Sequence, residues 1–227
     1  MDWKRAGVLA VLLFTMARPA ASQTLVVRVF NNFGVPAEEL QDARAYAASI
    51  LEDGGIEVTW MECWHLDKEA AGASARCRES TGSHEIVLRL QRANARSVER
   101  YTSLGFSLVV REGVAFLATV YPDLVESVSR GAGVRARDVL GRAIAHEIGH
   151  LLLNTNSHPA AGLMRAAWSR RELRRNAADD WRFLESEALI MREVVAARAP
   201  NQAKQETVHS SEHALSPRVY ARNRRIH

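Results

Sequence analysis

The pattern of hydrophobic and polar residues predicts a strand followed by a helix near the start of the chain. Residues 24–30 (TLVVRVF) are rich in β-branched side chains, which is typical of a buried strand. Apolar residues then recur at helical spacing between Pro36, a residue favoured in a first helical turn, and Gly54, which can end a helix. These recurring positions are Leu40, Ala43, Ala47, Ile50 and Leu51.

Four more strands and three helical segments are predicted further along the chain. The strands cover residues 56–63, 84–90, 105–110 and 114–121. The helical segments cover residues 123–130, 138–153 and 169–197. Asp138 is a favourable N-cap residue for the second of these segments. A strand, a helix, four strands and then helices predict one α/β domain with a mixed sheet.

Residues 1–22 have the layout of a secretory signal peptide. Lys4 and Arg5 precede an apolar stretch that ends at Ala17, and small residues follow it. A membrane anchor would need roughly 20 apolar residues, and this stretch is shorter. We therefore expect cleavage before Gln23 and a secreted or periplasmic protein with no stable membrane insertion.

The composition fits one folded domain, because 47% of the 227 residues are hydrophobic and 25% are charged. The formal net charge of +4 resides at the two ends. Residues 1–22 carry a net +2 and residues 198–227 a net +4, which leaves −2 for residues 23–197. We therefore expect no nucleic-acid partner. We also expect a monomer. Residues 23–197 are predicted to form the folded domain, and residues 198–227 a disordered basic tail.

The chain has two cysteines, Cys63 and Cys77. Export to an oxidising compartment favours a disulfide between them. Two alternatives are a pair of free thiols and a second metal site formed by Cys63, His65 and Cys77. The absence of a paired C-x-x-C spacing argues against the metal site.

The segment with the clearest chemistry is residues 146–150, which read HEIGH and match the pattern H-E-x-x-H. In a helix, His146 and His150 lie one turn apart on the same side and can hold one metal ion. Glu147 is then placed to take a proton from a metal-bound water. The apolar residues Leu140, Ile144, Ile148, Leu151 and Leu152 form a stripe roughly opposite the histidines. We expect the helix to bury this stripe and to turn the histidines toward a cleft.

A zinc site needs a third protein ligand, and His158 lies eight residues beyond His150. Asn154 can end the helix in the left-handed conformation, so that the chain reverses and brings His158 back to the ion. The alternative third ligand is a downstream carboxylate, with Glu172, Glu185 and Glu187 as candidates.

The H-E-x-x-H motif, the third histidine and Met164 in a turn downstream together resemble the metzincin clan of zinc endopeptidases. The resemblance covers roughly residues 24–165. It implies a mostly parallel sheet whose fourth strand is an antiparallel edge strand that binds an extended peptide, with the active-site helix and a C-terminal helix. The family spacing would place glycine at position 153 and the third histidine at 156, where this chain has Leu153 and Asn156.

By this resemblance, one catalytic zinc ion is bound by His146, His150 and His158, and Met164 lies beneath the site. The implied activity is that of a secreted zinc-dependent endopeptidase acting on peptide or protein substrates. Peptide bonds would be hydrolysed through a zinc-bound water with Glu147 as the general base. Two alternatives are a non-catalytic zinc-stabilised binding protein and a zinc amidase that acts on non-protein amides.

Overall fold

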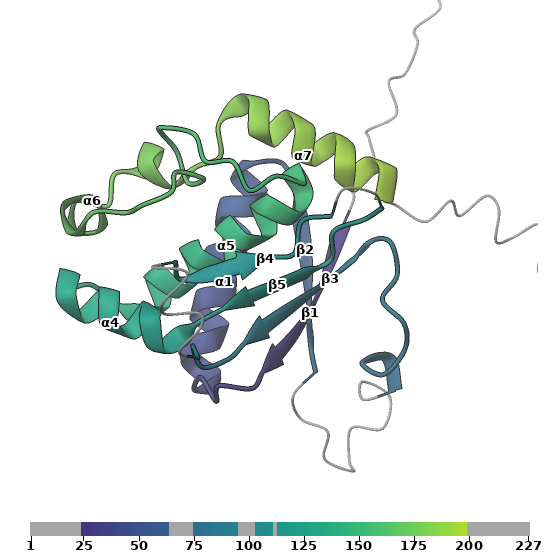
Figure 1. The fold of residues 1–227 in the computed structure, drawn as a ribbon, viewed down its shortest axis with the longest axis horizontal. Helices are drawn as coiled ribbons and strands as arrows, with labels where there is room; N and C mark the ends of the chain where they lie inside the picture. The colour runs from purple at the N-terminus through teal and green to yellow at the C-terminus, as the bar shows by residue number, and fades with distance from the viewer. Residues whose placement is uncertain (1–23, 64–74, 95–102, 111–112, 199–227) are drawn as a thin grey trace, which may run out of the picture.

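The structure is a computed structural model that describes residues 24–63, 75–94, 103–110 and 113–198 (Figure 1). Its strands are β1 (Thr24–Asn31), β2 (Glu57–Glu62), β3 (Glu85–Leu90), β4 (Gly105–Ser107) and β5 (Leu117–Val120). Its helices are α1 (Ala37–Asp53), α4 (Pro122–Ala132), α5 (Ala136–Leu153), α6 (Arg170–Arg175), the 3₁₀ helix η1 (Ala178–Trp181) and α7 (Glu185–Arg198). The predicted signal peptide, His65 and residues 199–227 of the predicted tail lie outside the described residues.

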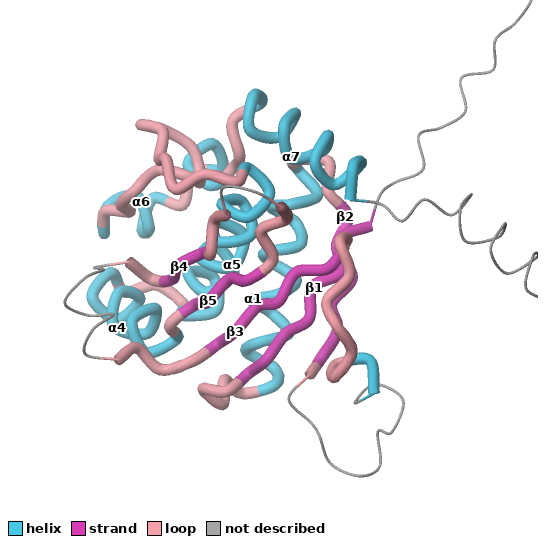
Figure 2. Tube along the Cα trace, turned by 45° about the vertical axis from the view of Figure 1, so that its right-hand side comes forward, coloured by secondary structure: helices cyan, strands magenta, loops and turns pink. Residues whose placement is uncertain are grey.

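The five strands form one sheet with the order β2-β1-β3-β5-β4. Strands β2, β1, β3 and β5 run parallel to one another, and β4 pairs with β5 in the antiparallel direction. Figure 2 shows these strands side by side, with the helices gathered behind them. The expectation of a mostly parallel mixed sheet with an antiparallel edge strand is therefore confirmed.

The structure corrects several predicted boundaries. The fourth and fifth strands are shorter than expected, at residues 105–107 and 117–120. Asp138 does not cap α5, which begins at Ala136 and has Arg135 as its N-cap residue. Instead, the carboxylate of Asp138 accepts a hydrogen bond from Arg135 Nε at 2.9 Å. In the first turn of the helix, its negative charge also interacts favourably with the helix dipole.

The segment predicted as a helical region over 169–197 consists of three elements, α6, η1 and α7. A capping box between Ser169 and Glu172 starts α6, and Asn176, with a φ of 50°, ends it in the left-handed conformation. Trp181 then turns into the core at the end of η1. The left-handed residue Asn176 thus interrupts the helical path between α6 and η1. The last of the three, α7, ends at Arg198, where the tail was predicted to begin.

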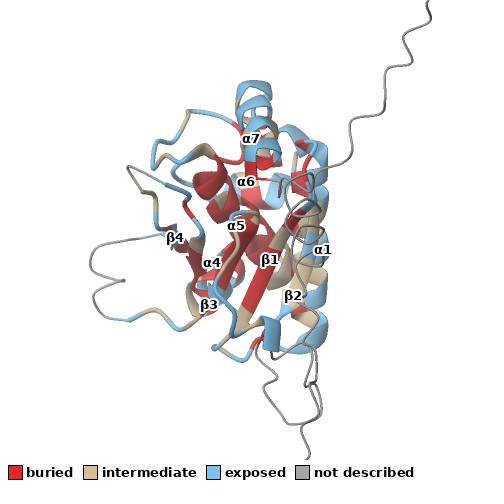
Figure 3. Cartoon of the chain, turned by 90° about the vertical axis from the view of Figure 1, so that its right-hand side faces the viewer, coloured by how far each residue is buried: buried red, intermediate tan, exposed pale blue. Residues whose placement is uncertain are grey.

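The hydrophobic core lies between the sheet and helices α1 and α5. Alternate residues of β1 and β3 face these helices, among them Val27, Val29, Ile86 and Leu88, which are fully buried. Helix α5 packs against α1, α4, α7, β4 and β5, so it is enclosed on most sides (Figure 3). The apolar stripe of α5 is buried as expected, and the C-terminal elements also bury residues on other sides of the helix.

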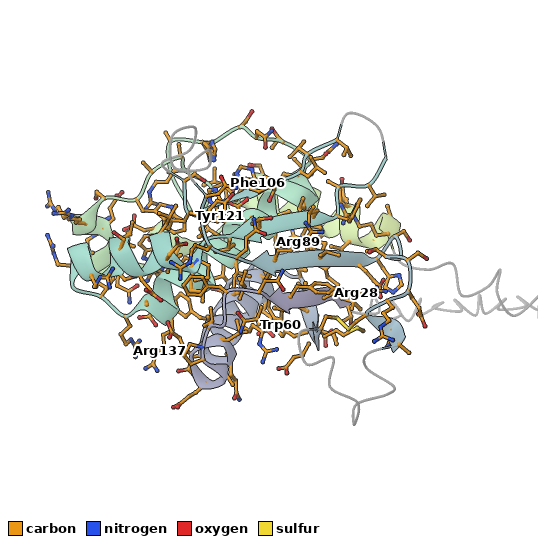
Figure 4. All side chains as sticks on the ribbon, turned by 60° about the horizontal axis from the view of Figure 1, so that its bottom comes forward. Arg28, Trp60, Arg89, Phe106, Tyr121 and Arg137 are labelled. Carbon is orange, nitrogen blue, oxygen red and sulfur yellow. A yellow bond between two sulfur atoms is a disulfide. The ribbon has the colours of Figure 1, made fainter. Side chains whose placement is uncertain are left out.

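On the opposite face of the sheet, a buried ion pair joins Arg28 and Glu85 at 2.5 Å. Figure 4 shows Arg28 and Arg89 on neighbouring strands, with Phe106 on the edge strand. Arg28 also donates to the carbonyl of Glu79 at 2.8 Å, and this hydrogen bond holds the loop before β3 against the strands. A disulfide between Cys63 and Cys77 ties the same loop to the end of β2.

Among the described residues, no helix combines the length and apolar character that crossing a membrane requires.

Candidate metal centre

Three histidine side chains converge at the C-terminal half of α5. His146 and His150 lie one turn apart on this helix, and their Nε2 atoms are 3.0 Å apart. His158, from the following loop, places its Nε2 atom 3.1 Å from Nε2 of His150. Candidate ligand atoms from all three residues lie within 4.8 Å of one another. The structure thus brings together the three histidines that the sequence singled out.

The loop after α5 returns His158 to the helix because the helix ends sharply. Asn154 adopts the left-handed conformation, with φ 48° and ψ 44°, and its backbone N–H donates to the carbonyl of His150. The backbone N–H of Thr155 donates to the same carbonyl at 3.3 Å. Asn154 also accepts a hydrogen bond from the backbone N–H of Val110 through its side chain, at 3.3 Å. The chain therefore turns back within four residues.

Backbone carbonyls fix the tautomers of the two helical histidines. His146 Nδ1 is 3.0 Å from the carbonyl oxygen of Leu163, and His150 Nδ1 is 2.7 Å from that of Thr155. A carbonyl oxygen can only accept, so both Nδ1 atoms carry the hydrogen. Each Nε2 atom then presents a lone pair toward the other histidines. This outer hydrogen bond is the usual support of a metal-ligating histidine.

The convergent lone pairs fit a metal ion. With both Nδ1 atoms protonated, Nε2 of His146 and Nε2 of His150 are acceptors, so no hydrogen bond joins them and a cation between them would pair with both. Burial, with the neighbouring charge of His150, lowers the pKa of His146 to about 3, and burial also lowers the pKa values of His150 and His158. Neutral imidazoles are the form that binds zinc. Two nitrogens bound to one tetrahedral zinc ion lie about 3.3 Å apart, close to the separations here.

Glu147 is buried beside this cluster, with 4% of its surface exposed. Its Oε2 atom accepts a hydrogen bond from the hydroxyl of Ser107, on the edge strand β4, at 2.7 Å. Burial raises the pKa of Glu147 to about 8, and the hydrogen bond from Ser107 acts in the opposite direction. A carboxyl group that can carry a proton near neutral pH therefore lies next to the histidines.

The three carboxylates considered as alternative third ligands are engaged elsewhere. Glu172 accepts from the backbone N–H of Ser169 at 2.7 Å as part of a helix cap. Glu185 forms an exposed ion pair with Arg192 at 3.3 Å. Glu187 accepts from the backbone N–H three residues before it. Within the described residues, none of them joins the group of side chains that could hold a metal ion.

The turn that carries Met164 lies directly against α5. Gly162 has a φ of 77°, a conformation that glycine adopts without strain, and the backbone N–H of Leu163 donates to the carbonyl of Arg182. The carbonyl of Leu163 is the one that orients His146. Met164 follows it and is fully buried. This turn therefore both supports the histidine cluster and supplies an apolar side chain behind it.

Two residues of the site were not predicted from the sequence. Trp168 makes an edge contact with the ring of His146, with 5.7 Å between ring centroids, and its Nε1 atom donates to the carbonyl of Leu163 at 3.4 Å. Ser107 hydrogen-bonds to Glu147. The only sequence feature that could have placed Trp168 in the site was its position just after the Met164 turn. No sequence feature could have placed Ser107 there, because a serine in a short strand is not distinctive.

A cavity of about 310 Å³ opens beside His146 and Glu147. It is lined by Ser103, Leu104, Val128, Ala143, His146, Glu147 and residues 165–168. It lies between α4, α5, the start of β4 and the segment after the Met164 turn. Space for a ligand side chain therefore adjoins the histidine cluster directly.

The fold is similar to that of archaemetzincin from Methanopyrus kandleri, determined by crystallography. The match covers 80% of this chain and 99% of the archaemetzincin chain, with 16% sequence identity and a TM-score of 0.43. No protein-family model and no curated protein matches the chain. We therefore infer the function from the residues of the site itself.

Proposed function

We propose that this protein is a secreted zinc-dependent endopeptidase. The observation that carries the proposal is the convergence of three imidazole nitrogens, within 4.8 Å of one another, next to a buried carboxylate. A purely structural zinc site usually has four protein ligands, whereas three ligands leave a position for water or substrate.

His146, His150 and His158 would hold the ion. The carbonyls of Leu163 and Thr155 keep the rings of the first two in the orientation that presents Nε2. A zinc ion held by these residues would supply Lewis-acid chemistry, activating water and polarising a substrate carbonyl.

Glu147 would be the general base and then the general acid. Its carboxylate would take a proton from the water that attacks the scissile carbonyl and would pass the proton to the departing amine. The geometry favours this role because Glu147 and His146 line the same cavity. The burial that raises its pKa also suits a group that must hold a proton between the two steps.

The edge strand β4 would bind the substrate backbone. This strand pairs with β5 on one side and is the last strand in the sheet order, so an extended peptide can add to its other side. A substrate side chain next to the scissile bond would occupy the cavity beside His146. The preference for a peptide substrate rests on this combination of a sheet edge and an adjoining cavity.

Export is part of the proposal. Residues 1–22 carry the signal-peptide pattern, and the disulfide between Cys63 and Cys77 fits an oxidising compartment. The test is to express the full chain in a bacterial host and to determine the N-terminal sequence of the protein recovered outside the cytoplasm. A start at Gln23 supports export, and a full-length protein retained in the cytoplasm contradicts it.

The activity is tested with the zinc-loaded protein on denatured casein and on a mixed peptide library, with Glu147→Gln as the matched control. We expect cleavage by the wild type and a loss of at least about 100-fold in the variant, with the zinc content unchanged. Equal rates for the two proteins would remove Glu147 from the mechanism. Cleavage of peptidoglycan fragments without cleavage of any peptide would indicate an amidase instead.

A further inference from the structure

We propose that Ser107 is a positioning residue that holds the carboxylate of Glu147 in place for proton transfer. This inference rests on the proposed function, because it assigns Ser107 a role through the general base. It concerns a residue on strand β4, 40 positions before Glu147 in the sequence.

The hydroxyl of Ser107 contacts Glu147 at two points. Its Oγ atom is 2.7 Å from Oε2 of the carboxylate and 2.7 Å from the backbone carbonyl oxygen of the same residue. Within the described part of the chain, it is the only side chain that hydrogen-bonds to this carboxylate. Because one hydroxyl contacts both the carboxylate and the backbone carbonyl of Glu147, it holds the carboxylate close to helix α5.

A hydroxyl suits this position because it can donate one hydrogen bond and accept two. When Glu147 is ionised, Ser107 donates to Oε2. When the carboxyl group carries the proton on its other oxygen, Oε2 is a carbonyl oxygen and still accepts from Ser107. The contact is kept in both states, so the carboxyl group does not have to move between the two proton transfers.

Gly105 closes the other side of the carboxyl group. A Cβ atom at this position would lie 2.9 Å from both Cγ and Oε1 of Glu147, and 2.5 Å from the carbonyl oxygen of Thr119. Gly105 and Ser107 are two positions apart on β4, so both face α5 while Phe106 faces the other side. The strand thus gives Glu147 space at one position and a hydrogen bond at the other.

The strand that supplies these contacts is also the one proposed to bind substrate. Its antiparallel pairing with β5 places Gly105 opposite Val120 and Ser107 opposite Ala118. This register fixes both residues relative to α5, which packs against β4 and β5. The general base and the peptide-binding edge are therefore held by one short element.

The test compares Ser107→Ala with Ser107→Thr, which restores a hydroxyl, in the zinc-loaded full-length protein. The matched control is Ser129→Ala, because Ser129 is also buried and donates to a backbone carbonyl, but within α4. We expect Ser107→Ala to lower kcat by about 10- to 100-fold with little change in KM or zinc content. Ser107→Thr should recover most of kcat, and Ser129→Ala should match the wild type. Wild-type kcat in Ser107→Ala would overturn the proposal.

A second readout does not depend on activity. With ¹³C-labelled glutamate, the side-chain carboxyl resonance of Glu147 can be assigned by its absence in Glu147→Gln. We expect Ser107→Ala to shift this resonance and Ser129→Ala to leave it in place. An unshifted resonance in Ser107→Ala would contradict the contact even if the protein cleaves no peptide. A shifted resonance in a protein that cleaves no peptide would refute the proposed function while supporting the contact.

Discussion

The sulfur atom of Met164 occupies the space that a side chain on Gly149 would need. A Cβ atom built on Gly149 would lie 2.6 Å from Sδ of Met164 and 2.8 Å from Cε1 of Phe183. Gly149 is the residue between Ile148 and His150 in the H-E-x-x-H segment. The close approach of the Met164 turn to α5 therefore depends on glycine at this position of the motif.

We predict that Gly149→Ala destabilises the protein by about 1–2 kcal/mol, because overpacking of a core outweighs the higher helix propensity of alanine. The matched control is Gly131→Ala in α4, where the new Cβ atom would meet only the flexible side chain of Arg170, at 3.4 Å. That control should be neutral, or stabilising by up to about 1 kcal/mol. Urea unfolding followed by circular dichroism measures both changes. Equal midpoints for Gly149→Ala and the wild type would contradict the packing argument.

We predict that His158→Ala lowers the affinity for zinc by more than about 100-fold, since loss of a ligand costs more than loss of an outer hydrogen bond. Glu172→Gln should retain the zinc affinity of the wild type, because Glu172 caps α6. Elemental analysis after dialysis against a weak chelator gives the zinc content of each protein. Zinc loss in Glu172→Gln, with zinc retained in His158→Ala, would identify Glu172 and not His158 as the third ligand.

We predict that removal of the disulfide in Cys63→Ala/Cys77→Ala lowers the free energy of unfolding by about 3 kcal/mol, the loop entropy expected for a separation of 14 residues. The double substitution avoids leaving one unpaired thiol. Chemical denaturation of the variant is compared with that of the oxidised wild type. If the reduced wild type and the variant unfold at the same midpoint, the loss comes from the cross-link itself.

We predict that Arg28→Met destabilises the protein by about 3–5 kcal/mol, because it leaves the buried carboxylate of Glu85 with only the exposed side chain of Arg76, at 3.9 Å, as a cation. The double variant Arg28→Met/Glu85→Leu removes both charges and should recover most of this loss. The comparison uses unfolding midpoints at neutral pH. No recovery in the double variant would mean that the contact of Arg28 with the Glu79 carbonyl supplies the stability.

Local patterns in the sequence were sufficient to predict the two candidate metal ligands on helix α5. The i, i+4 spacing of His146 and His150 places them one turn apart in any helix, whatever surrounds it. The left-handed tendency of asparagine similarly predicted that Asn154 would end α5, and the structure confirms this conformation. Because His158 follows Asn154 by only four residues, it had to lie in a short loop close to the end of α5. Boundaries such as the start of α5 were missed, because N-cap preference is weaker than the packing of the whole helix.

The sequence by itself determined the order of strands and helices as far as α5, the H-E-x-x-H motif and the small residues that end α1 and α5, because these depend on contacts within a few positions. Only the tertiary structure decided which side chains meet Glu147 and His146. Ser107 and Gly105 reach Glu147 because β4 returns antiparallel at the sheet edge. Trp168 reaches His146 because the Met164 turn packs against α5. Such contacts depend on strand order and helix packing. Periodicity in the sequence predicts local structure only, so it does not predict which distant residues will meet.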